Sequence, residues 1–242
     1  REGLRRGERT LSKLFAFAAS PALQEDFQAV IAAYADGNIP KAPQSARIVQ
    51  LAQRYADEIV DALVLNLLNG AEADSAAPKA LETVASLIKG TVHTLIKQVL
   101  SKLDNKELQP VAAYVATRRT ILKDAADAAG NESGERDYIS FDLSDADFAR
   151  FDAVWSANAA GQIDKAALNE TMLRFSTLAI AAFYEDSAKA LKLGFIARNL
   201  FNVGHSAIGK GSQLAINRLI PALREKEVRD FAAYFHGMLR AT

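Results

Sequence analysis

The chain has 242 residues, half of them hydrophobic, and it carries equal numbers of basic and acidic side chains, 29 of each. A chain of this length and composition buries a sizeable core, in one large domain or in two small ones. A formal net charge of zero produces no one-signed field, so we expect neither nucleic acid nor an anionic membrane surface as a partner. The absence of cysteine excludes disulfides, thiolate catalysis, cysteine zinc sites and iron–sulfur clusters.

No apolar run approaches the roughly 20 residues that a membrane-spanning helix needs, and the longest, at 59–68, is broken by Asp61 and Asn66. The sequence therefore predicts no membrane span, and we expect a cytoplasmic protein. A processed or exported chain stays open as an alternative, because the sequence starts at Arg1 and Ala16-Phe17-Ala18 is similar to a signal-peptide cleavage site.

The spacing of apolar residues predicts helices nearly everywhere, beginning with a short one at 11–15. Ser20 followed by Pro21 then marks a helix start, because serine caps helices and proline is tolerated in the first turn. Gly37 is typical of a residue that ends this helix, and we expect it to adopt a positive φ. The same expectation holds for Gly161, which occupies the matching place later in the chain.

Two longer helices follow. Ser45 opens the first, whose second half is apolar nearly all round, and Asn69-Gly70 end it. The second begins at Pro78 and is predicted to be an amphipathic helix of about seven turns. Its apolar stripe consists of Leu81, Val84, Ile88, Val92, Leu95, Val99 and Leu103.

Asp104 can cap the next helix, which is predicted to run to about Ala129. The segment 130–137 (GNESGERD) is the only polar, glycine-bearing stretch of any length, so we interpret it as a junction. The predicted organisation is a first helical unit at 1–129, the junction at 130–137 and a second helical unit at 138–242.

In the second unit, Ser144 and Asp147 form a variant of a capping box at the start of a helix. A helix from about Lys165 to Tyr184 comes next. A longer helix at 193–220 then contains Phe195, Phe201 and four glycines.

Two pairs of segments indicate that the chain is a tandem duplication. Segments 27–42 and 151–166 align without a gap and share nine of sixteen residues, and 106–115 matches 226–235 around the letters Ala-Ala-Tyr. The predicted fold class is therefore all-α: a tandem duplication of a roughly four-helix unit, packed into one helical bundle-like array.

The block at 226–235, and more weakly its counterpart at 106–115, resembles the C-terminal helix of class I c-type cytochromes. The haem-attaching C-x-x-C-H motif is absent because the chain has no cysteine. The resemblance therefore implies a way of packing an Ala-Ala-Tyr helix, and it does not imply haem.

Segment 204–212 differs by one letter from the phosphate-binding loop G-x-x-x-x-G-K-[ST], because Gly211 stands where that loop has its magnesium-binding hydroxyl. No strand pattern surrounds it, so we expect a helix loosened or broken by glycine. The three histidines, His93, His205 and His236, have no carboxylate at the Glu-x-x-His spacing of helical metal sites. His93 lies on the lysine-bearing face of its helix, which predicts a solvated side chain. We therefore expect no metal, no cofactor and no catalytic group.

The longer helix of the second unit is where we expect a pocket wall or a partner groove, because aromatic residues supply buried area and glycines loosen the backbone. The candidate ligand- or partner-binding residues are Phe195, Phe201, His205, Gly209 and Lys210.

The sequence favours a non-enzymatic binding or scaffolding protein, with a possible regulatory role, that acts through a protein partner or self-association. The alternative is a carrier of a small apolar ligand or lipid in a cavity between helices, and an enzyme of unknown class comes third. A cavity lined by apolar residues would favour the carrier, whereas a broad exposed apolar patch would favour the partner site.

Overall fold

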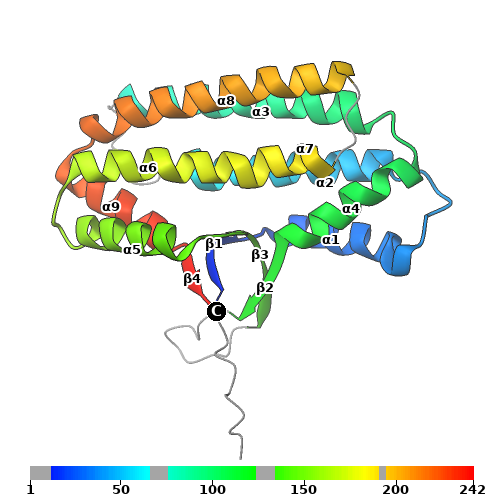
Figure 1. Cartoon of the computed structure of the whole chain (residues 1–242), viewed down its shortest axis with the longest axis horizontal. Helices are drawn as coiled ribbons and strands as arrows, with labels where there is room; N and C mark the ends of the chain where they lie inside the picture. Colours follow the sequence, from blue (N-terminus) through cyan, green and yellow to red (C-terminus); the bar gives the residue numbers. More distant parts are fainter. Residues whose placement is uncertain (1–11, 66–75, 124–133, 191–194) are drawn as a thin grey trace, which may run out of the picture.

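A four-stranded antiparallel sheet lies at one side of the molecule, and the helices stack above it (Figure 1). The computed structural model describes residues 12–65, 76–123, 134–190 and 195–242. The predominance of helix is confirmed, but the sheet was not predicted. Its strands are β1 (Lys13–Ala18), β2 (Arg119–Lys123), β3 (Glu135–Asp142) and β4 (Leu239–Ala241).

β1 takes the place of the short helix predicted at 11–15, so that prediction is wrong. Successive side chains of a strand point to opposite faces. Accordingly, Phe15 and Phe17 enter the main core while Leu14 and Ala16 join a smaller cluster. Apolar residues three and four apart fit one helical turn, but pairing with β3 gives the backbone of β1 its hydrogen bonds along the strand.

The elements follow the same order in the two halves of the chain. Between β1 and β2 lie α1 (Pro21–Ala33), the 3-10 turn η1 (Ala35–Gly37), α2 (Ser45–Val60), the π-helical turn η2 (Asp61–Leu65), α3 (Ala76–Leu100) and α4 (Asn105–Arg118). Between β3 and β4 lie α5 (Asp145–Ala159), α6 (Lys165–Ile180), the π-helical turn η4 (Ala181–Glu185), α7 (Asp186–Ala190), α8 (Phe195–Ala222) and α9 (Glu225–His236). Apart from η1 in the first half and α7 in the second, both halves thus read strand, two helices, π-helical turn, long helix, helix, strand.

The strand order β2-β3-β1-β4 ties the halves together. β1 and β3 pair at the centre of the sheet, with Phe15 opposite Phe141. β2 pairs with β3, and β4 pairs with β1. The last strand of each half therefore pairs with the first strand of the other half.

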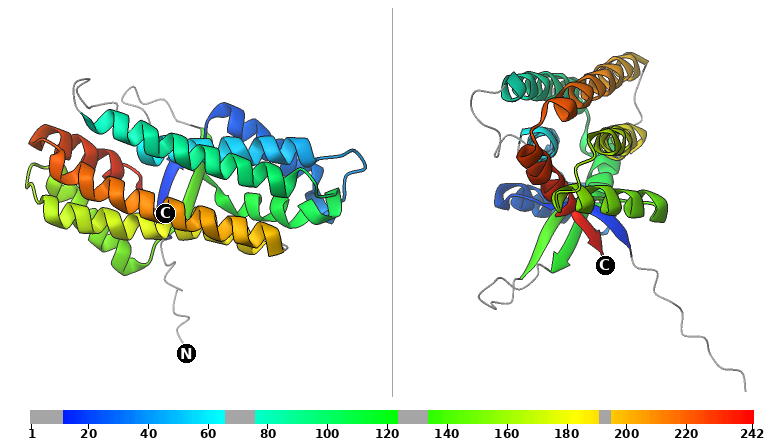
Figure 2. Two further views of the ribbon diagram at one scale, coloured as in Figure 1. Left: turned by 90° about the horizontal axis from the view of Figure 1, so that it is seen from above. Right: turned by 90° about the vertical axis from the view of Figure 1, so that its left-hand side faces the viewer.

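The helices form successive layers away from the sheet. α1 and α5 lie beside the strands, α2 and α6 come next, and α3 and α8 lie farthest away (Figure 1; Figure 2, right). The four long helices are neighbours in the pairs α2 with α3, α3 with α8, and α6 with α8. They form a bundle on top of the sheet.

The predicted helix starts and stops follow local capping chemistry. The Ser20 hydroxyl accepts the amide N–H of Leu23 at the start of α1, and the Ser144 hydroxyl accepts that of Asp147 at the start of α5. Gly37 and Gly161 have φ angles of 74° and 92°, which confirms the expected positive φ. Such angles favour glycine because a Cβ atom would be strained there.

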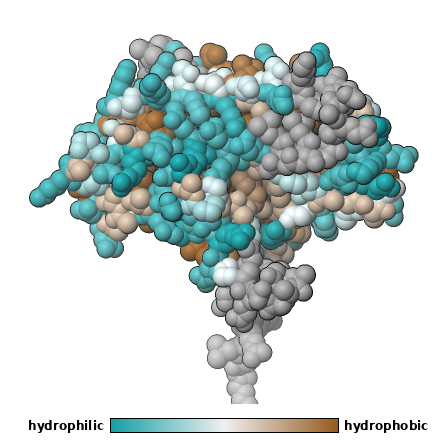
Figure 3. Space-filling model, turned by 180° about the vertical axis from the view of Figure 1, so that it is seen from behind, coloured by the Kyte–Doolittle hydropathy of each residue, from teal (hydrophilic) through white to brown (hydrophobic). Residues whose placement is uncertain are grey.

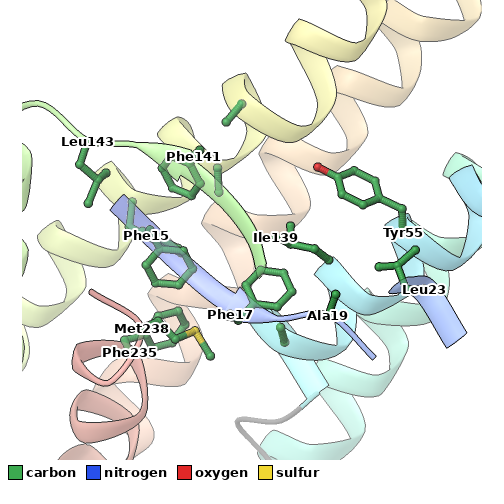
Figure 4. Close-up of a cluster of buried hydrophobic side chains, with 14 of the residues drawn as sticks. Phe15, Phe17, Ala19, Leu23, Tyr55, Ile139, Phe141, Leu143, Phe235 and Met238 are labelled. Carbon is green, nitrogen blue, oxygen red and sulfur yellow. The ribbon is translucent and has the colours of Figure 1, made fainter. Parts of the chain in front are cut away.

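Aromatic rings from both halves meet above the sheet (Figure 4). The Phe15 ring lies 4.6 Å from Phe175, 5.6 Å from Phe141 and 6.2 Å from Phe235, between centroids. Trp155, which is fully buried, packs 5.4 Å from Phe235. One hydrophobic core therefore runs through both halves.

The helix predicted to reach Ala129 ends at Arg118, because the chain then turns into β2 and pairs with β3. Of the predicted junction at 130–137, residues 130–133 lie outside the described residues and 135–137 belong to β3. The second unit, predicted to start at residue 138, thus starts within a strand. The predicted helix stop at 69–70 also lies outside the described residues.

Among the described residues, no helix is both long enough and apolar enough to span a membrane.

Candidate functional site

Two adjoining cavities lie between the long helices. The first has a volume of about 170 Å³ and is lined by residues of α2, η2, α3, α6, η4, α8 and α9. The second has a volume of about 120 Å³ and extends toward α4. The two share the lining residues Ala56, Ile59, Val92, Phe183 and Tyr184. They therefore lie next to each other within the bundle.

The apolar stripes read from the sequence supply much of the lining. From α3, Leu81, Val84 and Ile88 line the first cavity, Leu95 and Val99 line the second, and Val92 lines both. Across from them stand small side chains, including Ala56 of α2, Ala179 of α6 and Ala215 of α8. A core packs without gaps when large side chains fill the space opposite small ones. Here the side chains opposite the alanines are only medium-sized, which leaves space between the helices.

The lining is almost entirely hydrocarbon. Within the described part of the chain, no Asp, Glu, Lys, Arg or His lines either cavity. The hydroxyls of the second cavity belong to Tyr55, Tyr114, Tyr184 and Ser187. Burial raises the pKa of Tyr184 to about 12. Burial likewise raises the pKa of Tyr114 to about 12, although the Arg118 guanidinium acts to lower it. The cavities are therefore uncharged.

The two π-helical turns lie at the wall of this space. Leu63 and Val64 of η2, and Phe183 and Tyr184 of η4, line the cavities. A π-helical turn inserts an extra residue into a helix, and such turns occur frequently at functional sites.

A tyrosine from the opposite half holds each π-helical turn. Tyr114 Oη of α4 donates to the carbonyl oxygen of Ala182 in η4 at 3.1 Å, and Tyr234 Oη of α9 donates to that of Ala62 in η2 at 2.8 Å. These are the tyrosines of the repeated Ala-Ala-Tyr blocks. The repeat was visible in the sequence, but the acceptors were not, because they lie far away along the chain.

Of the five predicted site residues, Phe201 lines the second cavity, and its ring stacks on Tyr184 at 4.2 Å. His205 Nε2 lies 2.8 Å from Glu185 Oε1 and outside the cavity lining. Gly209 has open space where a Cβ would stand, and Lys210 is exposed. Phe195 begins α8, and its side chain is not among those that the structure describes. The structure thus brings one of the five to the cavities.

Segment 204–212 lies within the uninterrupted helix α8. A phosphate-binding loop needs backbone N–H groups that point at the ligand, whereas inside a helix these groups bond to the preceding turn. The segment therefore does not form such a loop, as expected.

Each histidine pairs with a carboxylate from another segment: His93 Nε2 with Asp57 at 2.8 Å, His205 with Glu185, and His236 with Asp152 at 2.9 Å. His93, expected to be solvated, has a side chain that is 35% exposed. Its pairing with Asp57 was not predicted, because only neighbours on its own helix were considered. Each pair has a single carboxylate, and no group of three potential metal ligands occurs among the described residues.

Sequence reasoning missed most of the lining, including Tyr55, Phe183 and Tyr184. Their spacing is helical, and it does not distinguish a cavity wall from a filled core.

Comparison with known proteins finds no match among protein-family models, curated proteins or solved structures.

Proposed function

We propose that the protein binds a small apolar ligand in the two cavities between α2, α3, α6 and α8, as a carrier or ligand-dependent regulator. The observation that carries the proposal is the pair of adjoining, uncharged cavities. Ligand sites are typically concave, mostly apolar and equipped with a few polar groups. The four hydroxyls of the second cavity match that pattern.

The volumes limit the size of the ligand. An apolar cavity of about 150 Å³ holds one benzene molecule. Cavities of about 170 and 120 Å³ therefore suit a small aromatic molecule or a short hydrocarbon chain that passes from one to the other.

Filling the space tests the proposal. Ala56 lines both cavities, so Ala56→Leu should abolish ligand uptake and leave the free energy of unfolding within about 1 kcal/mol of the wild-type value. We expect benzene to raise the thermal midpoint of the wild type, because a ligand that binds only the folded state stabilises it. The midpoint of the variant should not move.

The matched control is Ala153→Leu on an exposed position of α5, which should respond to benzene as the wild type does. An unmoved wild-type midpoint would overturn the proposal. An equal response of Ala56→Leu and the wild type would place the binding elsewhere.

A second candidate is binding of a protein partner or self-association through the outer layer. Leu87 of α3 and Val203 and Leu214 of α8 are 57%, 70% and 52% exposed. Leu87 and Val203 border a shallow groove between the two helices. Figure 3 shows apolar residues along the edge of the molecule where these helices lie. Native mass spectrometry of the protein purified from its source separates the candidates, because it reports a bound small molecule or a bound chain.

We also infer that the two halves are copies of one ancestral unit. The inference is supported by the repeated order of elements, the exchanged strands and the paired tyrosine contacts. The gapless alignment of 27–42 with 151–166 needs correction at its end. Residues 41–42 precede α2, which begins at Ser45, whereas residues 165–166 already lie in α6.

A further inference from the structure

Tyr55 of α2 is a buried tyrosine beside the proposed ligand site. Its side chain lines the second cavity, and the residue is only 9% exposed. Its Oη has no hydrogen-bond partner within the part of the chain that the structure describes. A buried hydroxyl without a partner is costly, so such groups in proteins call for an explanation.

The other hydroxyls of this cavity already donate hydrogen bonds to backbone carbonyl oxygens. Tyr114 Oη donates to Ala182 O, Tyr184 Oη donates to Phe201 O at 3.0 Å, and Ser187 Oγ donates to Tyr184 O at 2.6 Å. Among the described lining residues of the second cavity, Tyr55 is therefore the hydroxyl whose proton has no acceptor.

Neighbouring rings hold Tyr55 in place. Phe27 and Phe183 pack edge-on against it, with centroids at 6.1 and 6.2 Å. Figure 4 shows its oxygen pointing away from Leu23 and Ala19, which lie near the sheet. A hydroxyl held in this way is preorganised, because little side-chain freedom is lost when an acceptor binds.

The surroundings select for a neutral acceptor. The cation that acts on Tyr55 is Arg118, which pairs with Asp186 at 3.2 Å and lies over the Tyr114 ring. Neither charged residue lines the cavity. An anionic ligand would lose its hydration without gaining a cation in contact, which is unfavourable in an apolar site.

We propose that the ligand is a neutral, mostly hydrocarbon molecule with one hydrogen-bond-accepting oxygen, of the ketone, ester or ether class, and that Tyr55 Oη donates to that oxygen. The proposal rests on the function proposed above and names the ligand class. The hydrocarbon part occupies the first cavity and the space shared by both, and the oxygen lies in the second.

The test compares two probes of the same shape. Acetophenone carries a carbonyl oxygen where isopropenylbenzene carries a methylene group. Calorimetric titration of the full chain should show that Tyr55→Phe weakens acetophenone binding about five- to tenfold and leaves isopropenylbenzene binding unchanged. Benzoate, which has a similar size and a negative charge, should bind more weakly than acetophenone.

Tyr34→Phe is the matched control. Tyr34 is also buried, and its Oη also lacks a partner among the described residues, but it lines neither cavity. It should alter binding of neither probe. Because each variant removes only a buried hydroxyl without a partner, both should keep or exceed the wild-type thermal midpoint, which confirms that they fold.

The outcomes distinguish a failure of the Tyr55 proposal from a failure of the proposed function. If both probes bind and Tyr55→Phe affects them equally, the Tyr55 proposal is overturned while the apolar-ligand function stands. If benzoate binds more tightly than acetophenone, the neutral ligand class is wrong. If neither neutral probe binds the wild type, the function itself fails, and the Tyr55 proposal fails with it.

Discussion

At the scale of single residues, Gly204 of α8 allows Tyr184 to approach the helix. A Cβ on Gly204 would overlap the Tyr184 hydroxyl and would also lie 3.4 Å from Thr91 Cγ2. Tyr184 lines both cavities and donates to Phe201 O. We therefore expect Gly204→Ala to displace the tyrosine and to lower the free energy of unfolding by about 1–3 kcal/mol, measured by chemical denaturation.

Gly209→Ala in the same helix is the control. A Cβ there meets open space, and alanine is a better helix former than glycine by about 1 kcal/mol, so this change should stabilise the protein. Equal effects of the two substitutions would show that the approach of Tyr184 does not require glycine.

At the scale of elements, the last helix of each half is bound to the π-helical turn of the other half through one tyrosine hydroxyl. Tyr114→Phe removes the hydrogen bond between α4 and η4, and Tyr234→Phe removes the one between α9 and η2. Each change leaves a carbonyl oxygen with one partner fewer. We expect each to cost about 1 kcal/mol of unfolding free energy in denaturant titrations.

The two sites are separate, so the double variant should lose about the sum of the single losses. Wild-type stability in both single variants would mean that these bonds contribute nothing and that the π-helical turns are held by packing alone.

At the scale of the whole molecule, neither half has a complete sheet or core. β1 takes both of its partners, β3 and β4, from the second half. The ring of Phe15 packs on Phe141, Phe175 and Phe235, which also belong to that half. We therefore expect residues 1–129 and 130–242, expressed separately, to show no cooperative thermal transition as monomers in circular dichroism.

Mixing the two fragments should restore the transition, because each supplies the strands and rings that the other lacks. A monomeric fragment that unfolds cooperatively on its own would instead make each half an independent domain.

The sequence by itself determined most of the helices and several of their capped ends, because their hydrogen bonds and caps are local. The helix predicted from Pro78 corresponds to α3 (Ala76–Leu100), and Ser20, Asp104 and Ser144 cap helices through amides two or three residues away. The positive φ of Gly37 and Gly161 likewise follows from local geometry.

Only the tertiary structure decided the sheet, the histidine pairs and the cavities. β1 pairs with a strand more than 100 residues away, and His93 meets Asp57 from another helix. The spacing of neighbouring residues along the chain therefore does not predict either contact. The apolar stripe of α3 indicated a buried face. Whether that face meets a filled core or a cavity depends on the sizes of the side chains that α2, α6 and α8 place opposite it, and only their packing in space brings those side chains together.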